Sequence, residues 1–109
     1  MKFIKHLAVV ALSLLFCFSA FADKLKVGFV YIGPVGDHGW TYMHEQGRLA
    51  VKKEFGDKVE TTFVENVKYG PQAETVIRAM AKNGMDIIFA TSFGYMEPML
   101  KVAKEFPNV

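Results

Sequence analysis

Three strand-like runs, each followed by a stretch of helical period, constrain the fold of this 109-residue chain more than any other feature. The runs are LKVGFVYI at 25–32, VETTFVEN at 59–66 and MDIIFATS at 85–92. Runs of this length that are rich in β-branched and aromatic residues are typical of strands. Strands that alternate with helices predict a parallel sheet with helices on its faces. We therefore expect an α/β fold in the order β-α-β-α-β-α.

The three predicted helices begin at Trp40, at Pro71 and near Met96. Gly56 is expected to end the first helix, and Pro107 lies just beyond the third. Residues that recur at three- and four-residue spacing are expected to face the core. They are Met43, Gly47, Ala50, Val51 and Phe55 in the first helix, Ala73, Val76, Ile77, Met80 and Ala81 in the second, and Met96, Met99, Leu100, Ala103 and Phe106 in the third. In the first helix, Glu45 and Arg48 are expected on other faces.

The first 22 residues have the layout of a secretory signal peptide. Two lysines precede the apolar run LAVVALSLLFCF, and Ala20-Phe21-Ala22 forms a small-x-small cleavage site. We expect cleavage after Ala22 and export to the periplasm. A transmembrane anchor is the alternative, but the apolar segment is short for a span of roughly 20 residues.

A lipoprotein attached through Cys17 is a second alternative, which Phe16 disfavours because the lipoprotein signal needs a small residue before the cysteine.

The chain carries 13 Lys and Arg residues against 11 Asp and Glu, and two of the lysines lie in the first 22 residues. Without that segment the acidic and basic side chains balance. No basic surface for nucleic acid is therefore predicted.

Two loops, GPVGDHGW at 33–40 and TSFGY at 91–95, follow the first and third predicted strands. In parallel α/β sheets the loops at the carboxyl ends of strands form the binding site, at the point where the strand order reverses. If the second and third strands pack on opposite sides of the first, these two loops border that point. Each combines glycines with hydroxyl groups and an aromatic side chain.

The spacing in these loops argues against several other kinds of site. GPVGDHG matches neither G-x-G-x-x-G nor G-x-x-x-x-G-K-[ST], and Asp37 would repel a phosphate. His38 and His44 are six residues apart, whereas a helical zinc pair needs three or four. Ser92 lacks the G-x-S-x-G context of a nucleophile. No metal, cofactor or catalysis is therefore expected.

Trp40 follows Gly39 and is expected at the mouth of a cleft. An indole in that position is suited to stack on a flat ligand. Asp37, Tyr42, Ser92 and Tyr95 could then form hydrogen bonds along the edge of that ligand, as in most small-molecule sites. The alternatives are that Trp40 covers the end of the first helix and that the two tyrosines are ordinary rim packing.

The segments KVGFVYIGPVGDHGWTYMHEQGR and AETVIRAMAKNGMDIIFATSFGY, together with the expected export, resemble the basic membrane protein (BMP) family of nucleoside-receptor-like proteins. These are substrate-binding proteins of ABC importers. The resemblance covers nearly all of residues 24–109. It implies a type I periplasmic-binding-protein fold, in which two α/β lobes close on a purine nucleoside or base. Residues 23–109 would be the N-terminal part of lobe one, with the rest of that lobe, the hinge and lobe two absent.

By this resemblance Trp40 stacks on the purine, while the first loop and the Ser92-Phe93-Gly94 loop line its edge and any ribose. Thr41 stands where many members have Asn, as in a subgroup that takes free bases such as adenine. An ABC permease would be the protein partner. The full set of expected ligand-binding residues is Asp37, His38, Gly39, Trp40, Tyr42, Ser92, Phe93, Gly94 and Tyr95. The alternative functions are a nucleoside hydrolase that uses Asp37 and His38 as acid–base groups, and a sensor that docks on a membrane receptor.

Overall fold

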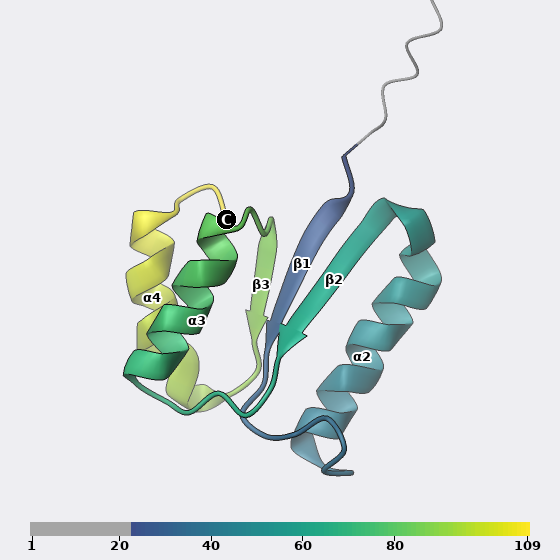
Figure 1. Ribbon diagram of the computed structural model, residues 1–109, viewed down its shortest axis with the longest axis horizontal. Coiled ribbons are helices and arrows are strands. Elements are labelled where there is room, and N and C mark those ends of the chain that lie inside the picture. The colour runs from purple at the N-terminus through teal and green to yellow at the C-terminus, as the bar shows by residue number, and fades with distance from the viewer. Residues whose placement is uncertain (1–22) are drawn as a thin grey trace, which may run out of the picture.

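The computed structural model describes residues 23–109 as a three-stranded sheet flanked by helices (Figure 1). The elements are β1 (Leu25–Val30), α2 (Trp40–Phe55), η1 (Gly56–Lys58), β2 (Val59–Val64), α3 (Pro71–Lys82), β3 (Ile87–Ala90), η2 (Phe93–Tyr95) and α4 (Met96–Glu105), where η marks a single 3₁₀ turn. The predicted order β-α-β-α-β-α is confirmed. The predicted signal peptide lies outside the described residues.

The sheet is parallel, with β1 in the centre and the order β2-β1-β3. Leu25 pairs with Val59 on one side, and Val27 pairs with Ile87 on the other. The chain therefore crosses over β1 between β2 and β3, and the strand order reverses between β1 and β3. The condition under which the two predicted loops border a binding crevice is met.

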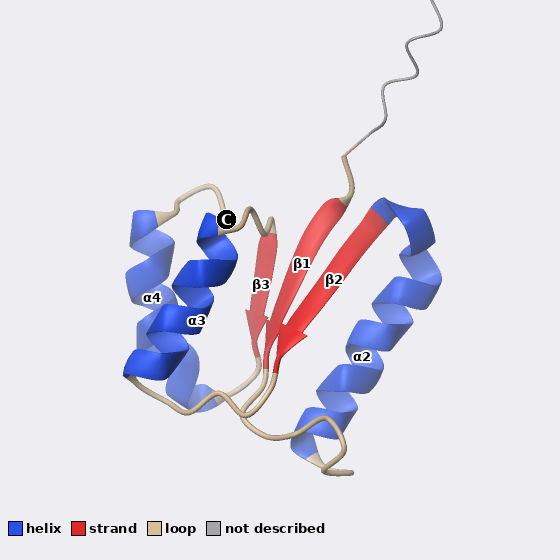
Figure 2. Ribbon diagram, viewed as in Figure 1, coloured by secondary structure: helices blue, strands red, loops and turns tan. Residues whose placement is uncertain are grey.

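Helices cover both faces of the sheet, with α2 on one face and α3 and α4 on the other (Figure 2). Alternation along β1 divides its side chains between two cores. Val27, Phe29 and Tyr31 face α2, whereas Val30 packs with Ile77, Met80, Tyr95 and Val102 on the opposite face. Gly28 lies on the α3 face, where a Cβ atom would come within 2.8 Å of the Met80 sulfur. Its missing side chain lets α3 approach the strand.

The buried face of α2 is polar, which corrects the sequence prediction. Thr41, Glu45 and Arg48 are buried, whereas Met43 is 64% and Phe55 50% exposed. The apolar stripe is turned to one side of this buried face, toward β1 and β3. Three of its residues, Met43, Gly47 and Val51, instead line a hollow of ≈ 320 Å³ with Phe29, His44, Phe89 and Thr91.

A buried ion pair explains this rotation. The Arg48 guanidinium donates to both Glu45 carboxylate oxygens, at 2.8 and 2.5 Å, and to the Thr61 hydroxyl of β2 at 2.8 Å. The Tyr31 hydroxyl donates to Glu45 Oε2 at 3.0 Å, and Arg48 lies 4.7 Å from the centre of the Phe63 ring. Hydroxyl groups on the sheet therefore require polar partners on α2, because an unpaired buried polar group is costly.

The same contacts shift the titration of all three groups. Hydrogen bonding to Arg48 lowers the pKa of Glu45, and hydrogen bonding to Glu45 raises that of Arg48. Burial raises the pKa of Tyr31 far above its ordinary value, and its bond to Glu45 adds to the rise. At neutral pH, Glu45 and Arg48 are charged and Tyr31 keeps its proton.

The predicted inner face of α3 is confirmed, because Ala73, Ile77, Met80 and Ala81 are buried and Val76 is partly buried. The prediction for α4 is only partly right. Met99 and Phe106 pack against the core, but the most buried positions are Pro98 and Val102, and Met96, Leu100 and Ala103 are exposed.

Packing against α3 explains the rotation of α4. Arg78 of α3 pairs with Glu105 of α4 at 2.7 Å, and Glu74 pairs with Lys101 at 3.0 Å. These contacts turn α4 toward its neighbouring helix as well as toward the sheet. None of the three α-helices in residues 23–109 is long and apolar enough to cross a membrane.

We predict that Arg48→Met lowers the free energy of unfolding by about 3 kcal/mol, because it leaves the Glu45 carboxylate buried without its partner. The double variant Glu45→Met/Arg48→Met should cost less than Arg48→Met alone, since it removes both charges. Urea unfolding of the full-length protein measures both values. A double variant as unstable as the two single variants added together would show that the pair is not coupled.

Candidate functional site

Asp37 caps helix α2, a role that the sequence reasoning did not assign to it. Gly39 occupies the N-cap position and has no side chain to offer. The Asp37 carboxylate takes over, accepting the N–H groups of Gly39 at 2.8 Å, Tyr42 at 2.9 Å and Thr41 at 3.2 Å. These bonds, that from Gly39 above all, lower the pKa of Asp37 below its ordinary value. Both carboxylate oxygens are thus engaged by the first turn of the helix.

Other hydrogen bonds fix the rest of the 33–40 loop. The Gly33 N–H donates to the Thr41 hydroxyl at 3.1 Å, and the Val35 N–H donates to the Glu65 carboxylate at 2.7 Å. A turn from Pro34 to Asp37 is closed by a backbone bond of 3.1 Å. The loop is therefore positioned by α2 and by the residue after β2 before any ligand is considered.

Trp40 joins the two predicted loops directly. Its indole N–H donates to the Thr91 carbonyl oxygen at 2.6 Å, although 51 residues separate the two in sequence. The indole is 61% exposed. His44 lies beside it, with ring centres 4.8 Å apart, and its Nδ1 donates to the Trp40 carbonyl at 2.8 Å. The ring is thus held along one edge, and much of its surface faces solvent.

The remaining predicted residues of the first loop lie beside Trp40. His38 is exposed and has a φ of 52°, in the left-handed region. Its ring lies 5.1 Å from that of Tyr42, which is half-buried. Within residues 23–109, no group of three or more His, Cys, Asp or Glu side chains could hold a metal ion.

The second loop divides between solvent and core. Phe93 is 85% exposed, and Ser92 and Gly94 are half-buried beside it. Tyr95 is only 1% exposed, and its hydroxyl donates to the Val67 carbonyl at 2.6 Å. Burial raises the pKa of Tyr95 to about 12. Because its one polar group is used inside the core, we leave Tyr95 out of the candidate site.

Tyr69 belongs to this cluster, although the sequence reasoning did not select it. It lies on the connection between β2 and α3, it is half exposed, and its hydroxyl is 2.5 Å from Ser92 Oγ. The available signal was an aromatic residue next to Gly70, directly before a helix. That signal is weak by itself, because β2 does not lie beside β3 and the 91–95 loop. The candidate site is therefore Trp40, Tyr69, Ser92 and Phe93, with His38, Gly39, Tyr42 and Gly94 around them.

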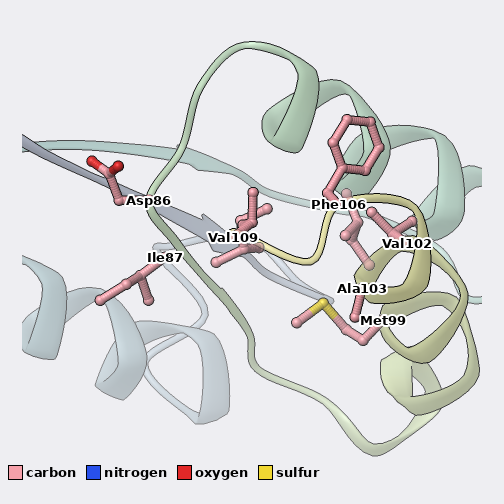
Figure 3. Close-up of a pocket in the computed structure, with 9 residues that line it drawn as sticks. Asp86, Ile87, Met99, Val102, Ala103, Phe106 and Val109 are labelled. Carbon is pink, nitrogen blue, oxygen red and sulfur yellow. The ribbon is translucent and has the colours of Figure 1, made fainter.

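A separate hollow of ≈ 300 Å³ lies between β3 and α4 (Figure 3). Its lining is apolar apart from Asp86, and it includes Met99, Val102, Phe106 and Val109. One Asp86 carboxylate oxygen already accepts the Lys26 N–H at 2.8 Å. Asp86 precedes β3, whereas the candidate site follows it, so the two are at opposite ends of the strand. Few polar groups converge on this hollow, and we assign it no ligand.

We predict that Asp37→Ala destabilises the first turn of α2 and lowers the stability of the protein at pH 7. Because the folded-state pKa of Asp37 is lowered, its contribution is complete above the ordinary pKa of the carboxyl group. It is lost as the pH falls through the lowered value. The difference in unfolding free energy between wild type and variant should therefore shrink in acid, as urea titrations at several pH values would measure. Glu60→Ala, at an exposed position of β2, is the control, and a pH-independent difference would contradict this capping role.

Comparison with known proteins places the chain in a family. Residues 24–109 match the model of the PnrA-like ABC transporter substrate-binding proteins, the Bmp family. A purine-binding protein of Brucella abortus is 60% identical over 87 residues, which are 80% of this chain and 25% of that protein. A protein of Haloferax volcanii described as an ABC transporter glucose-binding protein is 37% identical over 86 residues, 79% of this chain and 22% of its own.

Solved structures agree with these sequence matches. An ABC transporter solute-binding protein from Conexibacter woesei superposes with a TM-score of 0.71 at 28% identity, over 78% of this chain and 27% of that one. A second solute-binding protein, from Aeropyrum pernix, superposes with a TM-score of 0.68 at 27% identity, over 77% of this chain and 22% of that one. The chain thus spans about a quarter of the length of the relatives it matches. It belongs to the Bmp family of PnrA-like ABC transporter substrate-binding proteins.

Proposed function

We propose that this chain forms one wall of the binding cleft of an ABC importer's substrate-binding component, and that the ligand is a purine base or purine nucleoside. The observation that carries the proposal is the Trp40 indole, which is anchored by its N–H to Thr91 and exposed at the carboxyl edge of the sheet. A flat aromatic ligand would stack on such a ring. The 60% identity to a protein named for purine binding supports the same ligand class.

The polar groups near Trp40 fit a neutral ligand. Ser92 and Tyr69 present hydroxyl groups, and the Asp37 carboxylate is engaged by backbone N–H groups. Hydroxyl groups can both donate and accept, as the nitrogen-rich edge of a purine requires. His38, Gly39, Tyr42, Phe93 and Gly94 complete this wall in the proposal.

A sugar is the second candidate ligand, because the Haloferax volcanii relative is described as glucose-binding. Sugars also bind against aromatic rings and hydroxyl groups, so the residues of this wall do not by themselves separate the two. A titration with both ligand classes does.

The proposed mechanism is binding by closure of two walls, without catalysis. Contacts from both walls would offset the cost of ordering the ligand. A hydrolase that used Asp37 as an acid–base group has little support, because three N–H bonds hold that carboxylate in its charged form. The closed protein would deliver its ligand to a permease at the membrane.

We predict that the full-length protein binds adenine or a purine nucleoside, and that Trp40→Ala weakens this binding about 5- to 150-fold. The range follows from a stacking contribution of about 1–3 kcal/mol for each base. Isothermal titration with adenine, guanosine and glucose measures it.

Trp40→Phe is the matched variant, because it keeps an aromatic face but loses the bond to Thr91. It should weaken binding less than Trp40→Ala does. Equal affinity of wild type and Trp40→Ala for the purine would remove Trp40 from the site. Tight binding of glucose without purine binding would favour the sugar instead.

We also predict that the exported protein begins at Asp23, because cleavage after Ala22 removes the predicted signal peptide. N-terminal sequencing of the protein from the periplasmic fraction tests this. A lipid-modified N-terminus at Cys17 would instead show that the protein is a lipoprotein.

A further inference from the structure

The connection between β2 and α3 passes across the carboxyl end of the sheet. β2 lies at one edge of the sheet, whereas α3 packs on the face opposite to α2. The segment from 65 to 70 therefore has to cross the end of β1 (Figure 1). Along the way the Asn66 N–H donates to the Gly33 carbonyl at 3.3 Å, and the Val67 N–H donates to that of Tyr31 at 3.0 Å. The crossing brings Tyr69 to the 91–95 loop, although β2, the strand that precedes Tyr69, is not adjacent to β3.

Three contacts hold the exposed Tyr69 side chain in place. Its ring meets the buried Tyr95 ring edge-on, with centres 5.4 Å apart and planes at 77°. Gly94 lies directly against the ring, where any Cβ atom would collide with it. The Tyr69 hydroxyl is 2.5 Å from Ser92 Oγ. Fixing a half-exposed side chain costs conformational entropy, which the ring contacts offset.

The Tyr69–Ser92 contact lies one residue from the Trp40–Thr91 contact. Trp40 bonds to Thr91 and Tyr69 bonds to Ser92, so two aromatic side chains from different loops contact consecutive residues. The backbone of Ser92 is extended, with φ −149° and ψ 148°. A flat ligand stacked on the indole and extending along this segment would bring its edge to the two hydroxyl groups.

Two hydroxyl groups in contact share only one of their two protons. Either oxygen can be the donor, and the accepting hydroxyl keeps its own O–H for a third group. The pair therefore offers one free donor together with unused lone pairs. Reversing the shared bond moves the free donor from one oxygen to the other, and no heavy atom has to move.

We propose that Tyr69 and Ser92 form a reversible hydroxyl pair that reads the exocyclic group of the purine stacked on Trp40. The pair would accept from an amino group, as in adenine, and donate to a carbonyl, as in hypoxanthine. This inference rests on the proposed function and adds a residue, Tyr69, that determines specificity. Its prediction is acceptance of both base types, with discrimination against a base that has neither group.

The test is isothermal titration of the full-length protein with adenine, hypoxanthine and unsubstituted purine. Tyr69→Phe keeps the ring contacts with Gly94 and Tyr95 and removes only the hydroxyl. It should weaken the binding of adenine and hypoxanthine about 10-fold, the usual effect of one hydrogen bond, and leave the affinity for unsubstituted purine unchanged. Ser92→Ala should behave likewise, and the double variant should lose less than the two single losses combined. Thr62→Val, at an exposed hydroxyl of β2, is the control.

The outcomes separate this inference from the function on which it rests. Wild-type protein that binds no purine overturns both. Wild-type binding of adenine that Tyr69→Phe and Ser92→Ala leave unchanged overturns the hydroxyl pair alone. Equal weakening of all three bases by Tyr69→Phe also overturns it, because the hydroxyl would then only order the loop.

Discussion

The placement of the candidate site depends on the buried ion pair between Glu45 and Arg48. It fixes how α2 is rotated on the sheet, since the pair also binds Tyr31, directly after β1, and Thr61 of β2. Trp40 is the first residue of the same helix. A rotation of α2 that brought its apolar stripe onto the sheet would move the indole away from Thr91. A buried charge pair contributes little net stability compared with apolar packing, but separating its two charges leaves each of them buried without a partner, which is costly. The orientation of the indole is therefore set by an ion pair about one and a half to two turns further along the helix.

Asp37, the acidic residue of the first loop, caps helix α2, and its carboxylate is therefore not free to bind a ligand. Asp37 takes the place of Gly39 at this cap, so its carboxylate is engaged by the first turn of the helix. Its charge is balanced by backbone N–H groups at the positive end of the helix dipole. The polar groups that face the crevice are then mainly hydroxyls. Such a surface suits a neutral ligand better than a phosphate.

Much of the fold and part of the site could be predicted from the sequence. The alternation of strand and helix patterns, the inner face of α3 and the exposed indole beside a glycine all follow from local residue order. The polar face of α2 could not be predicted, because periodicity does not reveal that Tyr31 and Thr61 present hydroxyl groups to Glu45 and Arg48. Tyr69 was missed for a topological reason. Its loop crosses the sheet only because α3 lies on the opposite face from α2, which no local pattern shows.

The hydrogen bond of Trp40 also limits what that residue can contribute to recognition. An indole has a single N–H and no acceptor, and in this protein the N–H is bonded to Thr91. Trp40 can therefore offer a ligand its ring face but no hydrogen bond. Stacking of this kind distinguishes flat from non-flat ligands and distinguishes poorly between related bases, because every base has a π-face. Discrimination among flat ligands must come from neighbouring groups that still have free donors and acceptors. The Thr91 hydroxyl is already bonded to the Val30 carbonyl, so on this wall such groups are the hydroxyls of Ser92, the next residue, and of its partner Tyr69.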